Sequence, residues 1–111
     1  MFARVTTVQV SPDQIEESVR FAREEVLPVV QERPGFKAMY HLVNREAGHV
    51  LGITLWETEE DMLATEEQAR RLRIAAVKHG APSEPTAQVY EVSFQSGEGQ
   101  SYATLLAQVV F

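Results

Sequence analysis

Residues 34–58, PGFKAMYHLVNREAGHVLGITLWET, constrain the fold most, because they predict a β-hairpin that is apolar on both faces. Side chains alternate between the two faces of a strand, so one face carries Phe36, Ala38, Tyr40, Leu42, Leu51, Ile53 and Leu55. The opposite face carries Met39, His41, Val43, Val50, Gly52, Thr54 and Trp56. A turn centred on Glu46 and Ala47 pairs Leu42 with Leu51 and Tyr40 with Ile53. Neither face is suited to water, so both require cover.

The length of the chain limits how that cover can be supplied. A chain of 111 residues suits a single domain. A domain of this size buries only about two-thirds of the surface that its unfolded chain exposes. A sheet that is apolar on both faces therefore needs its own helices on one face and a second molecule on the other.

The segments around the hairpin predict two helices and two further strands. Residues 2–10 alternate as a strand, and residues 11–33 follow as a helix with Ser11 as its N-cap and a kink expected at Pro28. Thr58 caps a second helix, which ends before Gly80. Residues 87–95 form a fourth strand, in which Glu91 is a candidate ion-pair partner for Arg4.

This order, β-α-β-β-α-β, predicts an α+β, ferredoxin-like domain over residues 1–95, with an antiparallel sheet and both helices on one face. The bare face predicts a homodimer packed sheet to sheet. We place the Leu51, Ile53 and Leu55 side at the dimer interface and the His41 and Trp56 side under the helices. The uncharged, apolar C-terminal segment, residues 96–111, is expected to contact the partner subunit.

Composition excludes several classes of function. The absence of cysteine excludes disulfides and thiolate chemistry, and the formal charge of −6 disfavours nucleic acid as a partner. Arg70, Arg71 and Arg73 form the only basic cluster, which we interpret as a solvated helix face next to Glu66 and Glu67. No apolar stretch is long enough to predict a signal peptide or a membrane span. We therefore expect a cytoplasmic protein without a membrane partner.

The run PGFKAMYHLVNREAGHVLGITLWETEEDM resembles the dimeric α+β barrel superfamily, in the branch called antibiotic biosynthesis monooxygenase-like. The shared elements are a helix ending in VLPVVQERPGF, the hairpin, and a strand ending in Trp56-Glu57 before an acidic helix start. The resemblance covers roughly residues 2–95. The resemblance implies a dimeric barrel with a cavity between the sheet and the helices. The family includes cofactor-independent oxygenases and haem-degrading enzymes.

The haem-degrading branch of that family uses an Asn in the first strand, a Trp at the end of the third strand and a His in the second helix. Trp56 matches the Trp, but the first strand carries Thr6 and Thr7. The helix region that should hold the His reads Thr65-Glu66-Glu67-Gln68. The resemblance therefore disfavours haem degradation, and we expect neither a cofactor nor a metal ion.

His41 is the candidate catalytic residue, because it lies mid-strand on the mixed face of the hairpin, together with Thr54 and Trp56. A histidine there is either a partly buried, hydrogen-bonded side chain or a general base that titrates near neutral pH. Candidate substrate-binding residues on the same face are Trp56, Thr54, Gly52 and Met39. Trp56 is either a core residue or an aromatic wall for a flat ligand, and the small Gly52 and Thr54 would leave that ligand space.

Two functions remain open at this point. The first is a cofactor-independent monooxygenase, an oxidoreductase of an aromatic or polycyclic small molecule, with His41 as the base. The second is a non-enzymatic dimer that binds a small apolar or aromatic ligand or has an accessory role. Fold alone does not decide between them; a cavity on the mixed face would favour a ligand.

Overall fold

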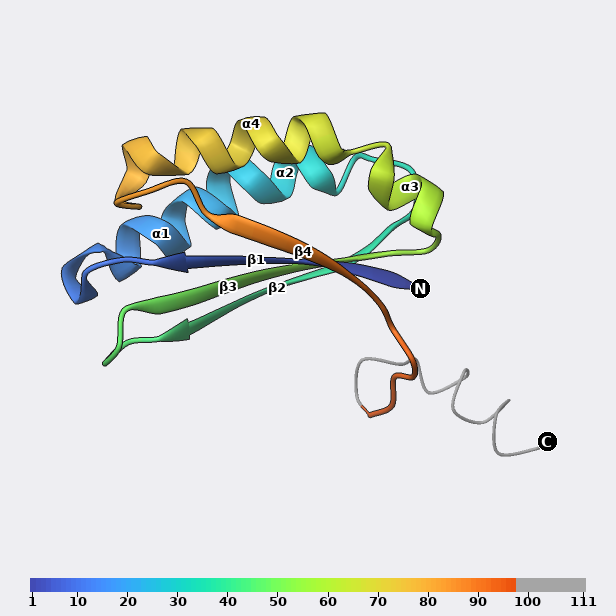
Figure 1. Cartoon of the computed structure of the whole chain (residues 1–111), viewed down its shortest axis with the longest axis horizontal. Coiled ribbons are helices and arrows are strands. Elements are labelled where there is room, and N and C mark those ends of the chain that lie inside the picture. Colours follow the sequence, from blue (N-terminus) through green and yellow to red (C-terminus); the bar gives the residue numbers. More distant parts are fainter. Residues whose placement is uncertain (98–111) are drawn as a thin grey trace.

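Four antiparallel strands form one sheet in the computed structural model, which describes residues 1–97. The strands are β1 (Phe2–Gln9), β2 (Phe36–Asn44), β3 (His49–Trp56) and β4 (Thr86–Glu91). Their spatial order is β2-β3-β1-β4, so β2 and β4 form the two edges (Figure 1).

Two helical runs cover one face of this sheet (Figure 1). The first consists of a 3₁₀ turn (Pro12–Gln14), α1 (Ile15–Phe21), a π-helical segment (Ala22–Val26) and α2 (Leu27–Val30). The second consists of α3 (Glu59–Leu63), α4 (Glu66–Ala76) and a 3₁₀ turn (Val77–His79). The predicted ferredoxin-like α+β fold with helices on one face is confirmed.

The register of the β2–β3 hairpin agrees with the sequence prediction, with one exception. Leu42 lies opposite Leu51 and Tyr40 lies opposite Ile53. A β-bulge after Phe36 sets this residue opposite Trp56, and the two rings meet edge to face with centroids 5.7 Å apart. A bulge adds one residue to a strand and so reverses the alternation of faces. The prediction that Phe36 shares the face of Tyr40 and Leu42 is therefore wrong.

The first helical run differs from prediction at its start. Ser11 makes no side-chain cap, because a 3₁₀ turn precedes α1. The irregularity expected at Pro28 occurs as the π-helical segment directly before it, where the Leu27 N–H donates to the Ala22 carbonyl. Proline has no N–H, and its ring disfavours a regular preceding turn.

The second run follows prediction, since the Thr58 hydroxyl caps α3 and Gly80 adopts a left-handed conformation with φ of 104°.

The core between the sheet and the helices divides into two clusters at opposite ends of the strands. One contains Val10, Ile15 and Val50, and the other contains Val30, Trp56 and Met62. The middle of the sheet, between these clusters, is therefore free to carry a cavity.

The opposite face of the sheet carries no helix, and its large apolar side chains are partly open. Tyr40 is 44% exposed and Leu42 is 48% exposed.

All but the first two residues of the expected extension over 96–111 lie outside the described residues. Within residues 1–97, the helices are too short or too polar to cross a membrane.

Candidate functional site

A cavity lies between the middle of the sheet and the helices. The space that the centre of a water molecule can reach there is about 120 Å³. Since one water occupies about 10–15 Å³ on this measure, the cavity holds considerably more than a single water. The sheet contributes Arg4, Thr6, Val8, Met39, His41, Val50, Gly52 and Thr54 to its wall. The helices contribute mostly apolar side chains, among them Phe21, Ala22, Val26, Val30 and Leu72.

Gly52 creates part of this space. It lies between Thr6 on β1 and His41 on β2 in the sheet register. A Cβ atom at Gly52 would meet no atom within 4 Å. The space beside Gly52 is open on the mixed face, and its predicted use by a ligand stays a prediction.

His41 lies half-buried on the cavity wall. It also lines a second hollow at the β2 edge, together with Arg23 and Phe36. Among residues 1–97, no side chain or carbonyl forms a hydrogen bond with its ring. Burial, and then the positive charge of Arg23, lower the pKa of His41 below its ordinary value. The imidazole is therefore neutral at neutral pH and has a nitrogen lone pair that can accept a proton.

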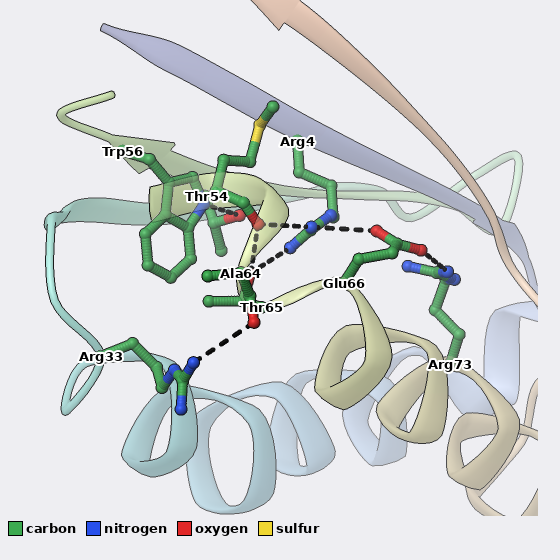
Figure 2. Close-up of polar contacts among 9 residues, drawn as sticks. Arg4, Arg33, Thr54, Trp56, Ala64, Thr65, Glu66 and Arg73 are labelled. Atoms are coloured by element: carbon green, nitrogen blue, oxygen red, sulfur yellow. Dashed lines mark hydrogen bonds and ion pairs between the residues drawn. The ribbon is translucent and has the colours of Figure 1, made fainter. Parts of the chain in front are cut away.

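Trp56 is fully buried and lies in the core cluster rather than on the cavity wall. Its indole Nε1–H donates to the Thr54 hydroxyl oxygen at 3.0 Å (Figure 2). This bond holds Thr54, which lines the cavity, in one orientation. Met39 contacts the Trp56 cluster and also lines both hollows. The structure therefore brings Met39, Gly52 and Thr54 together with His41, and places Trp56 behind Thr54.

A buried arginine, absent from the sequence prediction of the site, lies on the same wall. Arg4 is 4% exposed. Its Nη1 donates to the Thr65 hydroxyl at 2.9 Å (Figure 2). Its Nη2 donates to the Met62 carbonyl at 3.0 Å. Nη2 also lies 2.9 Å from a carboxylate oxygen of Glu66. These contacts join β1 to the region where α3 ends and α4 begins.

The ion pair expected between Arg4 and Glu91 does not form. Glu91 lies opposite Phe2 in the β1–β4 register, and Arg4 instead meets Glu66. The sequence contained a usable signal: Arg4 alternates with Phe2 onto the helix-facing side of the strand. An arginine buried there requires a carboxylate partner from the helix layer.

Arg73 extends this network. Its Nη2 lies 2.7 Å from the second carboxylate oxygen of Glu66, its side chain is 12% exposed, and it lines the cavity. The interpretation of the basic cluster as a solvated face holds for Arg70 and Arg71, which are exposed, but is wrong for Arg73. Arg73 lies on the side of α4 that faces the cavity, where it contacts Glu66.

Charge in this network is set by competition between burial and pairing. Burial lowers the pKa of Arg4, and the carboxylate of Glu66 opposes that effect. Burial acts to raise the pKa of Glu66, but the hydrogen bonds and charges of Arg73 and Arg4 outweigh it, so the pKa of Glu66 falls below its usual value. Glu66 is therefore ionised at neutral pH. Within residues 1–97, no group of three His, Asp or Glu side chains could hold a metal ion.

Sequence comparison identifies the family. Residues 1–76 match the family model described as antibiotic biosynthesis monooxygenase, so the chain belongs to that family. Two uncharacterized proteins of Mycobacterium tuberculosis H37Rv are 33% and 32% identical to it over 73 residues, which is 66% of this chain. The chain spans about a third of the length of these curated relatives, 33% and 31% respectively.

Solved structures with the same fold include two with bound ligands. A monooxygenase from Streptomyces coelicolor in complex with nanaomycin D has a TM-score of 0.68 at 21% identity, over 86% of this chain and 92% of that one. The haem-degrader MhuD from Mycobacterium tuberculosis, with two haems in its active site, has a TM-score of 0.64 at 20% identity, over 87% and 100%. A protein of unknown function from Nitrosomonas europaea has a TM-score of 0.69 at 17% identity, over 86% and 91%.

The electrostatic contribution of Arg23 to His41 leads to a first prediction. Replacing Arg23→Gln should raise the pKa of His41 only part of the way to its ordinary value, because burial remains. The His41 ring protons, followed by NMR through a pH titration, report this pKa directly. Arg20→Gln is the matched control, since Arg20 lies in the same helical run and its charge is paired with Glu17 and Glu24.

The same shift sets the sign of a stability effect. Because folding lowers the pKa of His41, the unfolded chain binds more protons between the folded pKa and about 6.5. The free energy of unfolding should therefore decrease as the pH falls through this range, and decrease less in Arg23→Gln. An identical His41 titration in the wild type and in Arg23→Gln would contradict the conclusion that the charge of Arg23 lowers the pKa of His41.

Proposed function

We propose that this chain is a cofactor-independent monooxygenase subunit that acts on an aromatic or polycyclic small molecule. The observation that carries the proposal is the largely apolar cavity over the middle of the sheet, whose wall holds a neutral histidine with no hydrogen-bond partner among residues 1–97. An apolar cavity with a few polar groups is typical of small-molecule sites. A base with a lowered pKa inside it is typical of proton abstraction.

His41 has the central role in the proposed reaction. Its neutral imidazole takes a proton from a phenol-like substrate and leaves an electron-rich carbanion, which reduces O₂. The substrate carbon loses two hydrogens and gains one oxygen as a carbonyl, and the second oxygen leaves with those hydrogens as water. The substrate itself supplies the electrons, so the protein contributes positioning, proton transfer and exclusion of water.

The neighbouring residues have supporting roles in this proposal. Gly52 provides space for the ring system, and Met39 forms an apolar side of the pocket. Because the Thr54 oxygen accepts from Trp56, its own proton can donate to a substrate oxygen. Trp56 thereby acts as a positioning residue and does not itself contact the ligand.

The ligands in the related structures support a small-molecule site in this fold. The Streptomyces coelicolor monooxygenase holds nanaomycin D and MhuD holds haem. The residues of this chain do not fit haem, because the helix positions expected to hold an iron-binding histidine are occupied by Thr65 and Glu66. Both are hydrogen-bonded or ion-paired to Arg4.

A second function, a non-enzymatic dimer that binds a small ligand or has an accessory role, is favoured by one observation. No partner within residues 1–97 orients the His41 ring, whereas catalytic bases are commonly fixed by a third group. Binding without turnover distinguishes this function from the enzymatic one.

A homodimer is part of both proposals. The helix-free face of the sheet exposes Tyr40, Leu42 and Tyr90, and it carries Leu51 and Ile53 between them. Two copies of this face packed together would remove these side chains from water, as a twofold interface requires.

The enzymatic proposal is tested with His41→Gln and 1,8-dihydroxyanthrone as an oxidisable phenolic probe. Loss of a general base should lower turnover about 100-fold or more. The free energy of unfolding should change by less than about 1 kcal/mol, because within the described part of the chain His41 has no hydrogen bond to lose. Oxygen uptake measures the first quantity and urea denaturation the second. His49→Gln, at an exposed position in the same hairpin, is the control and should retain full turnover.

Equal turnover in His41→Gln and wild type would remove His41 from the mechanism. Tight binding of the anthrone without oxygen uptake in the wild type would favour the non-enzymatic function.

The dimer is tested by light scattering at micromolar concentration. Wild type should have the mass of two chains, and Leu42→Glu should have the mass of one, because a buried charge would oppose its own symmetry copy. Leu63→Glu is the matched control: Leu63 is 53% exposed but lies on α3, away from the sheet face, so this variant should remain dimeric. A monomeric wild type would contradict the proposed interface.

A further inference from the structure

The cavity wall has a charge opposite to that of the protein. The chain carries a formal charge of −6, yet among residues 1–97 each ionisable side chain on the wall is basic: Arg4, His41 and Arg73. Glu66 pairs with the two arginines but is not part of the wall. A cleft lined by one sign of charge attracts ligands of the opposite sign, and low-dielectric walls strengthen the effect.

The local pairing leaves this positive charge incompletely balanced. One carboxylate, Glu66, lies between two guanidinium groups, at 2.9 Å from Arg4 and 2.7 Å from Arg73 (Figure 2). Two cations and one anion leave a net charge of one positive unit beside a largely apolar cavity. His41, which is neutral, adds nothing to it.

Both arginines also retain hydrogen-bond donors without partners. Among residues 1–97, the buried Arg4 Nε and Arg73 Nη1 have no acceptor. A buried donor that is left unpaired is unfavourable, and most so on a charged group. An acceptor supplied by a ligand at this end of the cavity would pair with these donors and balance the excess charge.

We propose that the cavity binds an aromatic ligand carrying an ionised oxygen group, a carboxylate or a phenolate, and that Arg4 and Arg73 recognise this group. The inference rests on the proposed function and narrows its substrate class from aromatic or polycyclic molecules in general to those that carry a negative charge. Guanidinium groups suit carboxylates and phenolates because they form charge-assisted hydrogen bonds in a fixed planar geometry. The apolar helix side chains contact the ring system.

This arrangement also orients the ligand. Arg4 lies next to Thr54 in the register, and His41 lies next to Gly52 on the other side of β3. An anionic group held by the arginines therefore directs the remainder of the ring system across Gly52 toward His41. The anion site and the base lie on different sides of one strand, so binding and proton abstraction use separate groups.

The test compares 2-naphthoate with 2-naphthamide, two probes of nearly equal size and shape that differ by one negative charge. Isothermal titration calorimetry of the whole chain should give a naphthoate affinity about 10-fold or more above that of the amide, as expected for hydrogen bonds to a charged group. Arg73→Met should reduce this ratio to near one. Arg71→Met removes the same charge from the exposed side of α4 and should leave the ratio unchanged. Arg73→Lys, which retains the charge, should restore part of the difference in affinity between naphthoate and naphthamide.

The two probes separate failure of this inference from failure of the proposed function. Equal affinity for both probes in the wild type would overturn the anion preference and leave an aromatic site intact. A ratio retained in Arg73→Met would also overturn it. Absence of binding by either probe would count against both the anion site and the ligand cavity.

Discussion

The burial of Arg4 is the interaction on which the rest of this architecture depends. A guanidinium that is 4% exposed on the helix-facing side of a strand must be met by acceptors from the layer above. The α3–α4 junction supplies three of them: the Met62 carbonyl, the Thr65 hydroxyl and the Glu66 carboxylate. β1 is thereby tied to the second helical run at the point where α3 ends and α4 begins.

The cavity follows from where large side chains are present and where they are absent. Trp56 and Met62 fill the space at one end of the sheet, and Val10, Ile15 and Val50 fill the other. Between them the sheet side of the wall includes Gly52, Thr6 and Thr54, and the arginine network joins β1 to the start of α4. A close-packed protein interior normally leaves no such space. The space is therefore a feature of this sequence, with His41 and the two arginines on its wall.

The sequence predicted those features that depend on local periodicity. The alternation of side chains along the two hairpin strands determined the register and the face of each residue. A register shift of one residue would exchange the two faces. Phe36 was misplaced because a bulge leaves no mark in the alternation of so apolar a strand. The contacts of Arg4 were not predicted because the partners lie far apart along the chain: Arg4 and Thr65 are separated by 61 residues. No local pattern joins them, and Arg73 was grouped with exposed neighbours on composition alone.

The free energy of unfolding of Arg4→Met, compared with Arg20→Met, tests the role of this network most directly. Methionine retains an unbranched apolar side chain, so the change removes the charge and the hydrogen bonds while largely preserving packing. Arg4→Met should lower the free energy of unfolding by about 3 kcal/mol, because the Thr65 hydroxyl, the Met62 carbonyl and the Glu66 carboxylate each lose a charge-assisted hydrogen bond. Arg20→Met, which removes two exposed ion pairs, should lower it by less than about 1 kcal/mol. Equal losses in the two variants would contradict the view that Arg4 holds the helix layer over the sheet.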